Sequence, residues 1–466
     1  MLNLKNLKAE KLSFLRKQYP VFQFESFNYK HKKDDNSLIV SFLFGIPPDI
    51  KFNPTVKIES VDKDFFNDLE KDVIKNFVFN LGLVEMLSYW KATCSGTIEI
   101  KVGGLNKNQA SWWKNLLIKS LGEFFYQNNI NFREKNFVNF KSLTSNSFSK
   151  DRTLHEERFL TLNGGGRDTA VAFELLKELK KEIGILALNP TKASQDIANA
   201  SSISKHIVVK REIDGNLLKL NEMGYLNGHT PFSAYLAFLS AFCALIFDYK
   251  YIIASNERSS NEENIEFLGE KINHQYSKSF EFEESFREYL KANLSQGLDY
   301  SSILRPVYDI QVSKIFADYK KYLNLFRSCN RGQKNNAWCK ECPKCLSVYI
   351  SLYPFMDEKE LAKIFGEDLY AKKELLDLLL HLTGSKKPKP FECVGTYDEI
   401  IAGLRFSIKK LEKNKKSLSF LLEYAKKNII RNNDLDYREI LRAWDQKNFL
   451  TKGIATKLKE KISYGS

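Results

Sequence analysis

Residues 160–169 read Leu160-Thr161-Leu162-Asn163-Gly164-Gly165-Gly166-Arg167-Asp168-Thr169. A short apolar segment is followed by three glycines and then by an amphipathic pattern that predicts a helix over 169–182. Adjacent glycines allow a sharp turn and expose backbone N–H groups, and the positive end of a helix dipole favours an anion beside them. Between a strand and a helix, this pattern predicts a phosphate-binding loop. The spacing matches neither the Walker A loop nor the GxGxxG dinucleotide fingerprint.

Each residue of the loop has an expected role in holding phosphate. The backbone N–H groups of Gly164, Gly165 and Gly166 would cradle the oxygens, and the side chains of Arg167 and Thr169 would add donors. Asp168 would reach a magnesium ion bound to the same phosphates. We therefore predict that residues 164–169 bind a nucleotide.

The segments around this loop alternate between strand and helix. Residues 158–162, 185–188, 206–209 and 251–254 have strand patterns. Helical patterns occupy 169–182, the region near 194–203, and the apolar stretch that ends at Phe247. Such alternation predicts a parallel α/β sheet with helices on both faces. We predict three domains: an N-terminal α+β domain over 1–150, a nucleotide-binding α/β core over 155–355, and a helical, basic C-terminal region over 356–466.

Composition narrows the class of protein. The chain has 466 residues, 43% of them hydrophobic, and a formal net charge of +14. Much of the positive excess follows Arg405, where a solvated helical face is the favoured interpretation over nucleic-acid binding. The apolar stretch 224–247 is interrupted by Thr230-Pro231 and predicts a buried helix rather than a membrane span. With no N-terminal signal visible, we expect a cytoplasmic protein.

Four of the seven cysteines are closely spaced. Cys329, Cys339, Cys342 and Cys345 follow the pattern C-x9-C-x2-C-x2-C. Four thiolates at this density predict a closed tetrahedral metal site, for which structural zinc is favoured over an iron–sulfur cluster. The other three, Cys94, Cys243 and Cys393, are interpreted as lone thiols, and Cys243 as a core residue.

Three polar motifs lie between the loop and the cysteines. They are Asn227-Gly228-His229, the stretch 254–264 that follows the fourth strand, and the stretch 272–279, which contains His274, Tyr276 and Lys278. In an open parallel sheet, ligands bind beyond the carboxyl ends of the strands, where the second motif emerges. In that motif Glu257 is either a magnesium ligand or the partner of Arg258.

The glycine loop resembles the SGGxDS signature of the ATP pyrophosphatases (the adenine-nucleotide α-hydrolase superfamily, with a HUP-like core), with Gly164 in place of the first Ser and Thr169 in place of the last. In order along the chain, the motifs also resemble those of the UDP-N-acetyl-alpha-D-muramoyl-L-alanyl-L-glutamate epimerases. The strings that carry this resemblance are the loop, Asn227-Gly228-His229, Ser255-Asn256-Glu257-Arg258-Ser259, the segment 273–279, the four cysteines and Pro390-Phe391-Glu392-Cys393-Val394-Gly395. Tyr89-Trp90-Lys91-Ala92-Thr93-Cys94 and Trp112-Trp113 add to it.

The resemblance implies a reaction and its participants. ATP and Mg²⁺ would activate the terminal L-Glu of a UDP-muramoyl dipeptide as an acyl-adenylate, and epimerisation would yield D-Glu, AMP and diphosphate for peptidoglycan synthesis. His229, His274, Tyr276, Lys278 and Glu257 are the candidate catalytic residues. A structural Zn²⁺ and a muramoyl ligase that adds L-Glu complete the expected partners, and nucleic acid is not expected among them.

Other functions remain open at this point. A further adenylating enzyme of the superfamily, such as a 7-cyano-7-deazaguanine synthase-like enzyme or a tRNA thiolase, would carry a similar loop and a similar metal site. A persulfide-carrying Cys outside the metal cluster would favour that alternative. A regulatory module would bind ATP without releasing diphosphate. A nuclease would need a carboxylate cluster, and the sequence shows no convincing one.

Overall fold

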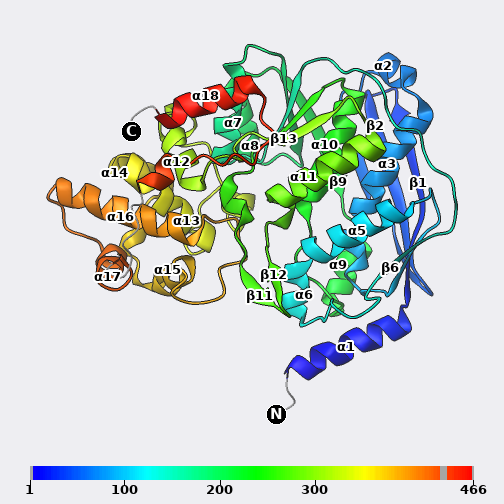
Figure 1. Cartoon of the computed structure of the whole chain (residues 1–466), viewed down its shortest axis with the longest axis horizontal. Coiled ribbons are helices and arrows are strands. Elements are labelled where there is room, and N and C mark those ends of the chain that lie inside the picture. The colour runs from blue at the N-terminus through cyan, green and yellow to red at the C-terminus, as the bar shows by residue number, and fades with distance from the viewer. Residues whose placement is uncertain (1–3, 431–437, 464–466) are drawn as a thin grey trace.

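The computed structural model describes residues 4–430 and 438–463, and one large mixed sheet runs through them (Figure 1). The strands of this sheet are β1 Val21–Lys32, β2 Ser37–Ile46, β3 Ile50–Phe52, β4 Thr55–Ile58, β5 Thr97–Ile100, β6 Asn139–Ser142, β7 Phe159–Leu162, β8 Ile183–Leu188, β9 Lys205–Glu212, β10 Tyr251–Ala254 and β13 Asp299–Ser302. A separate hairpin pairs β11 Ile265–Phe267 with β12 Glu270–Ile272.

Helices cover both faces of the sheet and fill the C-terminal end of the molecule, where α13 to α17 lie away from β1 and β2 (Figure 1). They are α1 Leu4–Gln18, α2 Lys63–Asp68, α3 Lys71–Glu85, α4 Leu87–Trp90, α5 Lys107–Ser120, α6 Gly122–Asn128, α7 Arg167–Lys177, α8 Lys192–Ser201, α9 Gly215–Glu222, α10 Phe232–Ile246, α11 Phe280–Tyr289, α12 Asp309–Ala317, α13 Pro343–Leu352, α14 Glu358–Phe365, α15 Leu376–Leu382, α16 Tyr397–Lys413, α17 Phe420–Asn428 and α18 Lys452–Ser463. Across the described ranges, none of these helices combines the length and apolarity needed to cross a bilayer.

The five parallel strands confirm the predicted α/β architecture. They lie in the order β13-β10-β7-β8-β9, and every neighbouring pair is parallel. The chain moves outward from β7 through β8 to β9, and then returns to place β10 and β13 on the other side of β7. The strand order therefore reverses between β7 and β10, and a reversal of this kind opens a crevice at the carboxyl ends of the two strands.

Successive residues of these strands enter two different hydrophobic cores. On β7, Phe159 packs with α7 and α8, whereas Leu160 packs with α3 and α10. On β10, Ile253 belongs to the same core as Phe159, and Ile252 belongs to the same core as Leu160. Burial on both faces explains why β7, β8 and β10 are almost wholly apolar rather than alternating.

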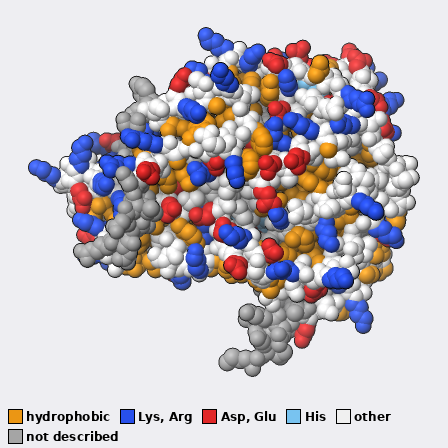
Figure 2. All heavy atoms as spheres, in the orientation of Figure 1, with side chains coloured by type: hydrophobic (Ala, Val, Ile, Leu, Met, Phe, Trp, Pro, Cys, Tyr) orange, Lys and Arg blue, Asp and Glu red, His pale blue; other side chains and the backbone are white. Residues whose placement is uncertain are grey.

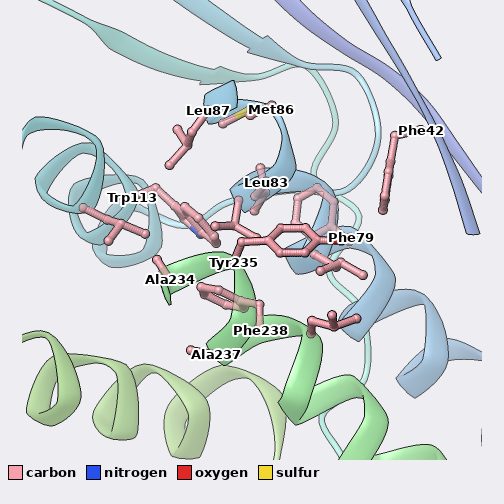
Figure 3. Packing of buried hydrophobic residues seen from close by; sticks show 14 of the residues in the cluster. Phe42, Phe79, Leu83, Met86, Leu87, Trp113, Ala234, Tyr235, Ala237 and Phe238 are labelled. Carbon is pink, nitrogen blue, oxygen red and sulfur yellow. The ribbon is translucent and has the colours of Figure 1, made fainter. Parts of the chain in front are cut away.

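The aromatic residues of α5 belong to the core that also contains α3 and α10. Trp113 is fully buried, and its ring stacks on Phe238 of α10 with 5.0 Å between centroids. Figure 3 shows both rings beside Tyr235 and Phe79. A capping box formed by Asn106 and Gln109 begins α5.

The N-terminal segment extends the same sheet through antiparallel pairs. Strand β4 pairs with β9, β2 with β4, and β1 with β2, after which β5 and β6 add parallel strands at the far edge. The sheet and its core thus continue across the predicted boundary near residue 150. Our division into three domains stays a prediction.

Several boundaries differ from those predicted. Helix α7 ends at Lys177 rather than near 182, because β8 already begins at Ile183. The apolar helix α10 begins only at Phe232, after Pro231. The residues of β6 belong to a polar stretch, and neither β1 nor β13 was predicted from the sequence.

Candidate active site

The glycine loop connects the end of β7 to α7. Gly165 has φ of +76°, and a Cβ at this position would lie 2.7 Å from the backbone nitrogen of Ser194, so the position requires glycine. Helix α7 has Gly166 as its N-cap, and no described side chain caps it. Its first-turn N–H groups therefore remain available to an anion, as a phosphate loop requires.

The side chain of Arg167 does not join this loop. Its guanidinium is 1% exposed and donates to Asp309, at 2.5 Å, and to the Ser351 hydroxyl, at 2.7 Å. Arg167 thus anchors α7 against α12 and α13. Since it does not line the cavity beside the loop, its placement does not support the predicted role as a phosphate donor.

A cavity of about 240 Å³ opens at the carboxyl ends of β7 and β10, where the strand order reverses. It brings together parts of five sequence motifs: the glycine loop, the stretch after β10, the segment around Lys278, the cysteine loop and the string that contains Cys393. The residues that line it are Leu162, Gly164, Gly166, Asp168, Thr169, Ser233, Leu236, Ala254, Ser255, Asn256, Glu257, Lys278, Tyr300, Arg327, Ser328, Cys329, Asn330, Gln333, Lys344 and Cys393.

Two carboxylates face this cavity without a cationic partner. Within the described residues, neither Asp168 nor Glu257 forms an ion pair, and Asp168 Oδ1 is buried with no hydrogen bond. Burial, together with the charges of Asp168 and Asp309, raises the pKa of Glu257 to about 7. Arg258 pairs instead with Asp445, at 3.6 Å. Of the two roles left open for Glu257, the pairing with Arg258 is therefore not formed, and that of a magnesium ligand stays a prediction.

Cys393 is not the isolated thiol that the sequence suggested. It lines the cavity, and Lys278 Nζ donates to its Sγ at 3.3 Å. Burial alone would raise the thiol's pKa, but the charge of Lys278 and an interaction with His274 lower the pKa to about 5. The thiolate in turn raises the pKa of Lys278. The site therefore holds an anionic sulfur beside a buried cation.

Neither of the two predicted histidines lines the cavity, and both approach one carboxylate. His274 Nδ1 is 2.5 Å from Glu123 Oε2, and His229 Nδ1 is 3.4 Å from the same oxygen. Burial would lower the pKa of His274, but its interactions with Cys393 and Glu123 raise it to about 9. Burial, followed by the charge of His274, lowers the pKa of His229 to about 3. The pair thus holds one charged and one neutral imidazole.

Glu123 and Cys393 are functional candidates that the sequence reasoning missed. Glu123 is part of α6, where it follows an aromatic helix and has no motif around it. Cys393 belongs to a string that carries the family resemblance, and this was the only signal for it. Tyr276 was predicted but does not line the cavity: its hydroxyl donates to Glu281, at 3.3 Å.

The four clustered cysteines have the geometry of a tetrahedral metal site. All four sulfur atoms lie within 4.8 Å of one another, and three of the Sγ–Sγ distances are 3.5, 3.7 and 3.9 Å. Zn–S bonds of about 2.3 Å in a tetrahedron place sulfurs roughly 3.8 Å apart, so the set fits zinc. The cysteine loop also touches the glycine loop, since the N–H of Arg327 donates to the carbonyl of Gly165, at 3.0 Å.

Two family models match this chain. The family model described as the MurL N-terminal domain matches residues 13–303, and the model of the MurL C-terminal domain matches residues 325–435. The first covers the cavity's phosphate loop and Lys278, and the second covers the cysteines and Cys393.

Three curated relatives carry the name UDP-N-acetyl-alpha-D-muramoyl-L-alanyl-L-glutamate epimerase. Those from Micromonospora sp. and Salinispora tropica are 32% and 33% identical over 251 residues, which is 53% of this chain and 56% and 55% of theirs. The Xanthomonas oryzae protein is 30% identical over 322 residues, 68% of this chain and 70% of its own length. The chain thus spans little more than half the length of the first two. Because the MurL N-terminal model alone matches more than half of the chain, this protein belongs to the MurL family of UDP-N-acetyl-alpha-D-muramoyl-L-alanyl-L-glutamate epimerases.

Proposed function

We propose that this chain epimerises the terminal L-Glu of UDP-N-acetylmuramoyl-L-alanyl-L-glutamate to D-Glu, with ATP consumed to AMP and diphosphate through an acyl-adenylate. The product would serve peptidoglycan precursor synthesis. The observation that supports this most is one cavity that combines an uncapped helix start, two unpaired carboxylates and a Lys–Cys pair. The names of the relatives supply the substrate.

Activation of the carboxylate answers the main chemical difficulty of this reaction. The α-proton of a free carboxylate is hard to remove because the product carries a second negative charge. Adenylation neutralises the carboxylate and allows the new charge to spread onto the carbonyl oxygen, where fixed positive groups stabilise it. Lys278 and Lys344 both line the cavity and would provide such charge.

The described residues suggest how ATP and a metal would be held. The first-turn N–H groups of α7 and the hydroxyl of Thr169 would bind phosphate oxygens. Asp168 and Glu257 would hold Mg²⁺, which neutralises charge on the phosphates during transfer. The four cysteines would hold a structural Zn²⁺ that fixes the neighbouring loop.

The proposed substrate must be made by another enzyme. A UDP-muramoyl dipeptide that ends in L-Glu requires a ligase that adds L-Glu, and we propose that this enzyme acts after such a ligase. On the face shown in Figure 2, Lys and Arg are mixed with Asp and Glu, and a polyanionic nucleotide substrate accounts for the net positive charge without a nucleic acid.

Asp168→Asn tests the proposed adenylation. We expect substrate-dependent AMP formation to fall by about 10²–10³-fold, because the metal loses a charged ligand where negative charge develops. The matched control is Asp64→Asn, which changes an exposed carboxylate on α2 and should leave the rate unchanged. AMP is quantified by chromatography, and circular dichroism verifies the fold. Undiminished AMP formation by folded Asp168→Asn would contradict the assignment.

A further inference from the structure

We propose that Cys393 is a catalytic nucleophile that takes the activated glutamyl group from the adenylate as a thioester, within a triad formed by Cys393, His274 and Glu123. This inference rests on the proposed adenylation and adds a covalent step to it. Neither the family models nor the relatives' names assign such a step.

The first support is the shared cavity. Cys393 lines the same cavity as the phosphate loop, so an acyl-adenylate formed there would lie beside the sulfur. The cavity also contains Glu257, which is 8% exposed and, within the described residues, forms no ion pair, although the charges of Lys278 and Lys344 act on it. A buried carboxylate without a direct partner is typical of a place where a ligand or metal binds. Cys393 therefore faces a ligand site.

The second support is the order of the side chains. A nucleophile that interacts with a histidine, which in turn is oriented by a carboxylate, is the arrangement that activates serine and cysteine nucleophiles on unrelated folds. Here His274 interacts with Cys393 and its Nδ1 lies 2.5 Å from Glu123 Oε2. The three residues come from segments far apart in the sequence, so local structure alone does not bring them together.

The charges around Cys393 favour a resting thiolate. Lys278 Nζ donates to Sγ at 3.3 Å, while Lys344 donates to the Cys393 carbonyl and adds positive charge. Opposing them, Glu392 precedes Cys393 in the chain, and its charge interacts with the thiol. The charges of Lys278, His274 and Lys344 lower the thiol's pKa to about 5, and the thiolate is the nucleophilic form.

The step balances without any further reactant. The thiolate attacks the carbonyl carbon of the glutamyl adenylate, a C–S bond forms, and the C–O bond to phosphate breaks. AMP leaves with the electron pair. After inversion at the α-carbon, water adds to the thioester, the C–S bond breaks, and the carboxylate and the thiolate are regenerated with release of two protons.

Acylation would also prepare the removal of the α-proton. Formation of the thioester removes the negative charge of Cys393. Lys278 and His274 then lose the anion that stabilises their protonated forms. Their pKa values then fall, and either group becomes able to exchange a proton with the substrate. The same two groups lie beside the thioester, where positive charge stabilises an enolate oxygen.

The experiment traps the covalent intermediate. Wild-type protein in excess over the L-Glu dipeptide is mixed with ATP and Mg²⁺, quenched in acid within one turnover, and analysed by intact-protein and peptide mass spectrometry. We expect a mass increase equal to the UDP-muramoyl dipeptidyl group on the Cys393 peptide, without AMP. Turnover with no adduct on Cys393 would overturn the proposal.

Two variants separate this step from adenylation. Cys393→Ser should retain substrate-dependent exchange of labelled diphosphate into ATP, while D-Glu product falls by about 10²-fold or more. Cys243→Ala, which removes a buried thiol from α10, should retain both activities. Epimerisation by Cys393→Ser at the wild-type rate would overturn the thioester. Absence of diphosphate exchange in the wild type would instead overturn the adenylation itself.

Discussion

At the scale of single residues, the environment of Cys393 predicts unusual reactivity. Because the pKa of its thiol is about 5, the thiolate already dominates at pH 6, and alkylation by iodoacetamide should have nearly the same rate at pH 6 and pH 8. In Lys278→Met the nearest cation is lost, the pKa rises, and the rate should increase with pH over this interval. Peptide mapping gives the rate at Cys393, and a tenfold rise from pH 6 to pH 8 in the wild type would contradict this account.

Sequence and structure differ most at this scale. The triple glycine and the cysteine spacing are local patterns, and the structure places residues of both beside one cavity, while their binding roles stay predictions. The side-chain direction of Arg167 could not be predicted, because its partner Asp309 lies far along the chain. The same holds for Glu123, whose role depends on contact with His274 from another segment.

At the scale of elements, we expect the cysteine loop to hold α13 in place beside the glycine loop. Cys342 caps α13, and the loop contacts Gly165 through Arg327. We expect Cys342→Ser to lose bound zinc and to lower the free energy of unfolding by about 3 kcal/mol or more, as loss of a metal ligand commonly does. Metal analysis and thermal unfolding measure both effects. Cys243→Ala should keep its metal, and a fully metallated, active Cys342→Ser would exclude a structural site.

The strands and helices of the parallel half were predictable because burial on both faces gives continuous apolar runs. Residues 251–254 were predicted as they occur in β10. Strand β13, which reads Asp299-Tyr300-Ser301-Ser302, lies at the sheet edge and has no such run. The amphipathic pattern of α7 appeared to continue beyond Lys177 because the polar turn before β8 is compatible with a helix.

At the scale of the whole molecule, the buried ion pair between Arg211 and Glu85 connects the N-terminal segment to the parallel strands. Arg211 of β9 donates twice to Glu85 of α3, both times at 2.8 Å, and the two side chains are 8% and 0% exposed. Removing one partner leaves an uncompensated buried charge. Glu85→Ala should therefore lower the free energy of unfolding by about 3–5 kcal/mol.

The matched control for this prediction is Glu59→Ala. Glu59 pairs with Lys210 on the surface, where the side chains are 33% and 58% exposed. Because solvent screens such a pair, the change should cost less than about 1 kcal/mol. Urea unfolding of both variants gives the two values, and equal losses would contradict the structural role of Glu85.

Sequence patterns could not predict that one sheet spans the N-terminal segment and the parallel strands. The antiparallel pairing of β4 with β9 joins residues about 150 positions apart, and no local signal specifies it. A boundary near residue 150 was inferred from polar composition, which marks a surface segment equally well. The fold class and most of the candidate site followed from local motifs, whereas their assembly into one cavity did not.

The most direct test of the proposed function is an incubation of the wild-type protein in deuterated water. ATP, Mg²⁺ and the L-Glu-terminated UDP-muramoyl dipeptide are supplied, and the glutamate released from the product is analysed for chirality and mass. We predict D-Glu with one deuterium at the α-carbon, formed together with AMP. D-Glu formed without ATP consumption, or AMP formed without deuterium incorporation, would contradict activation followed by proton exchange.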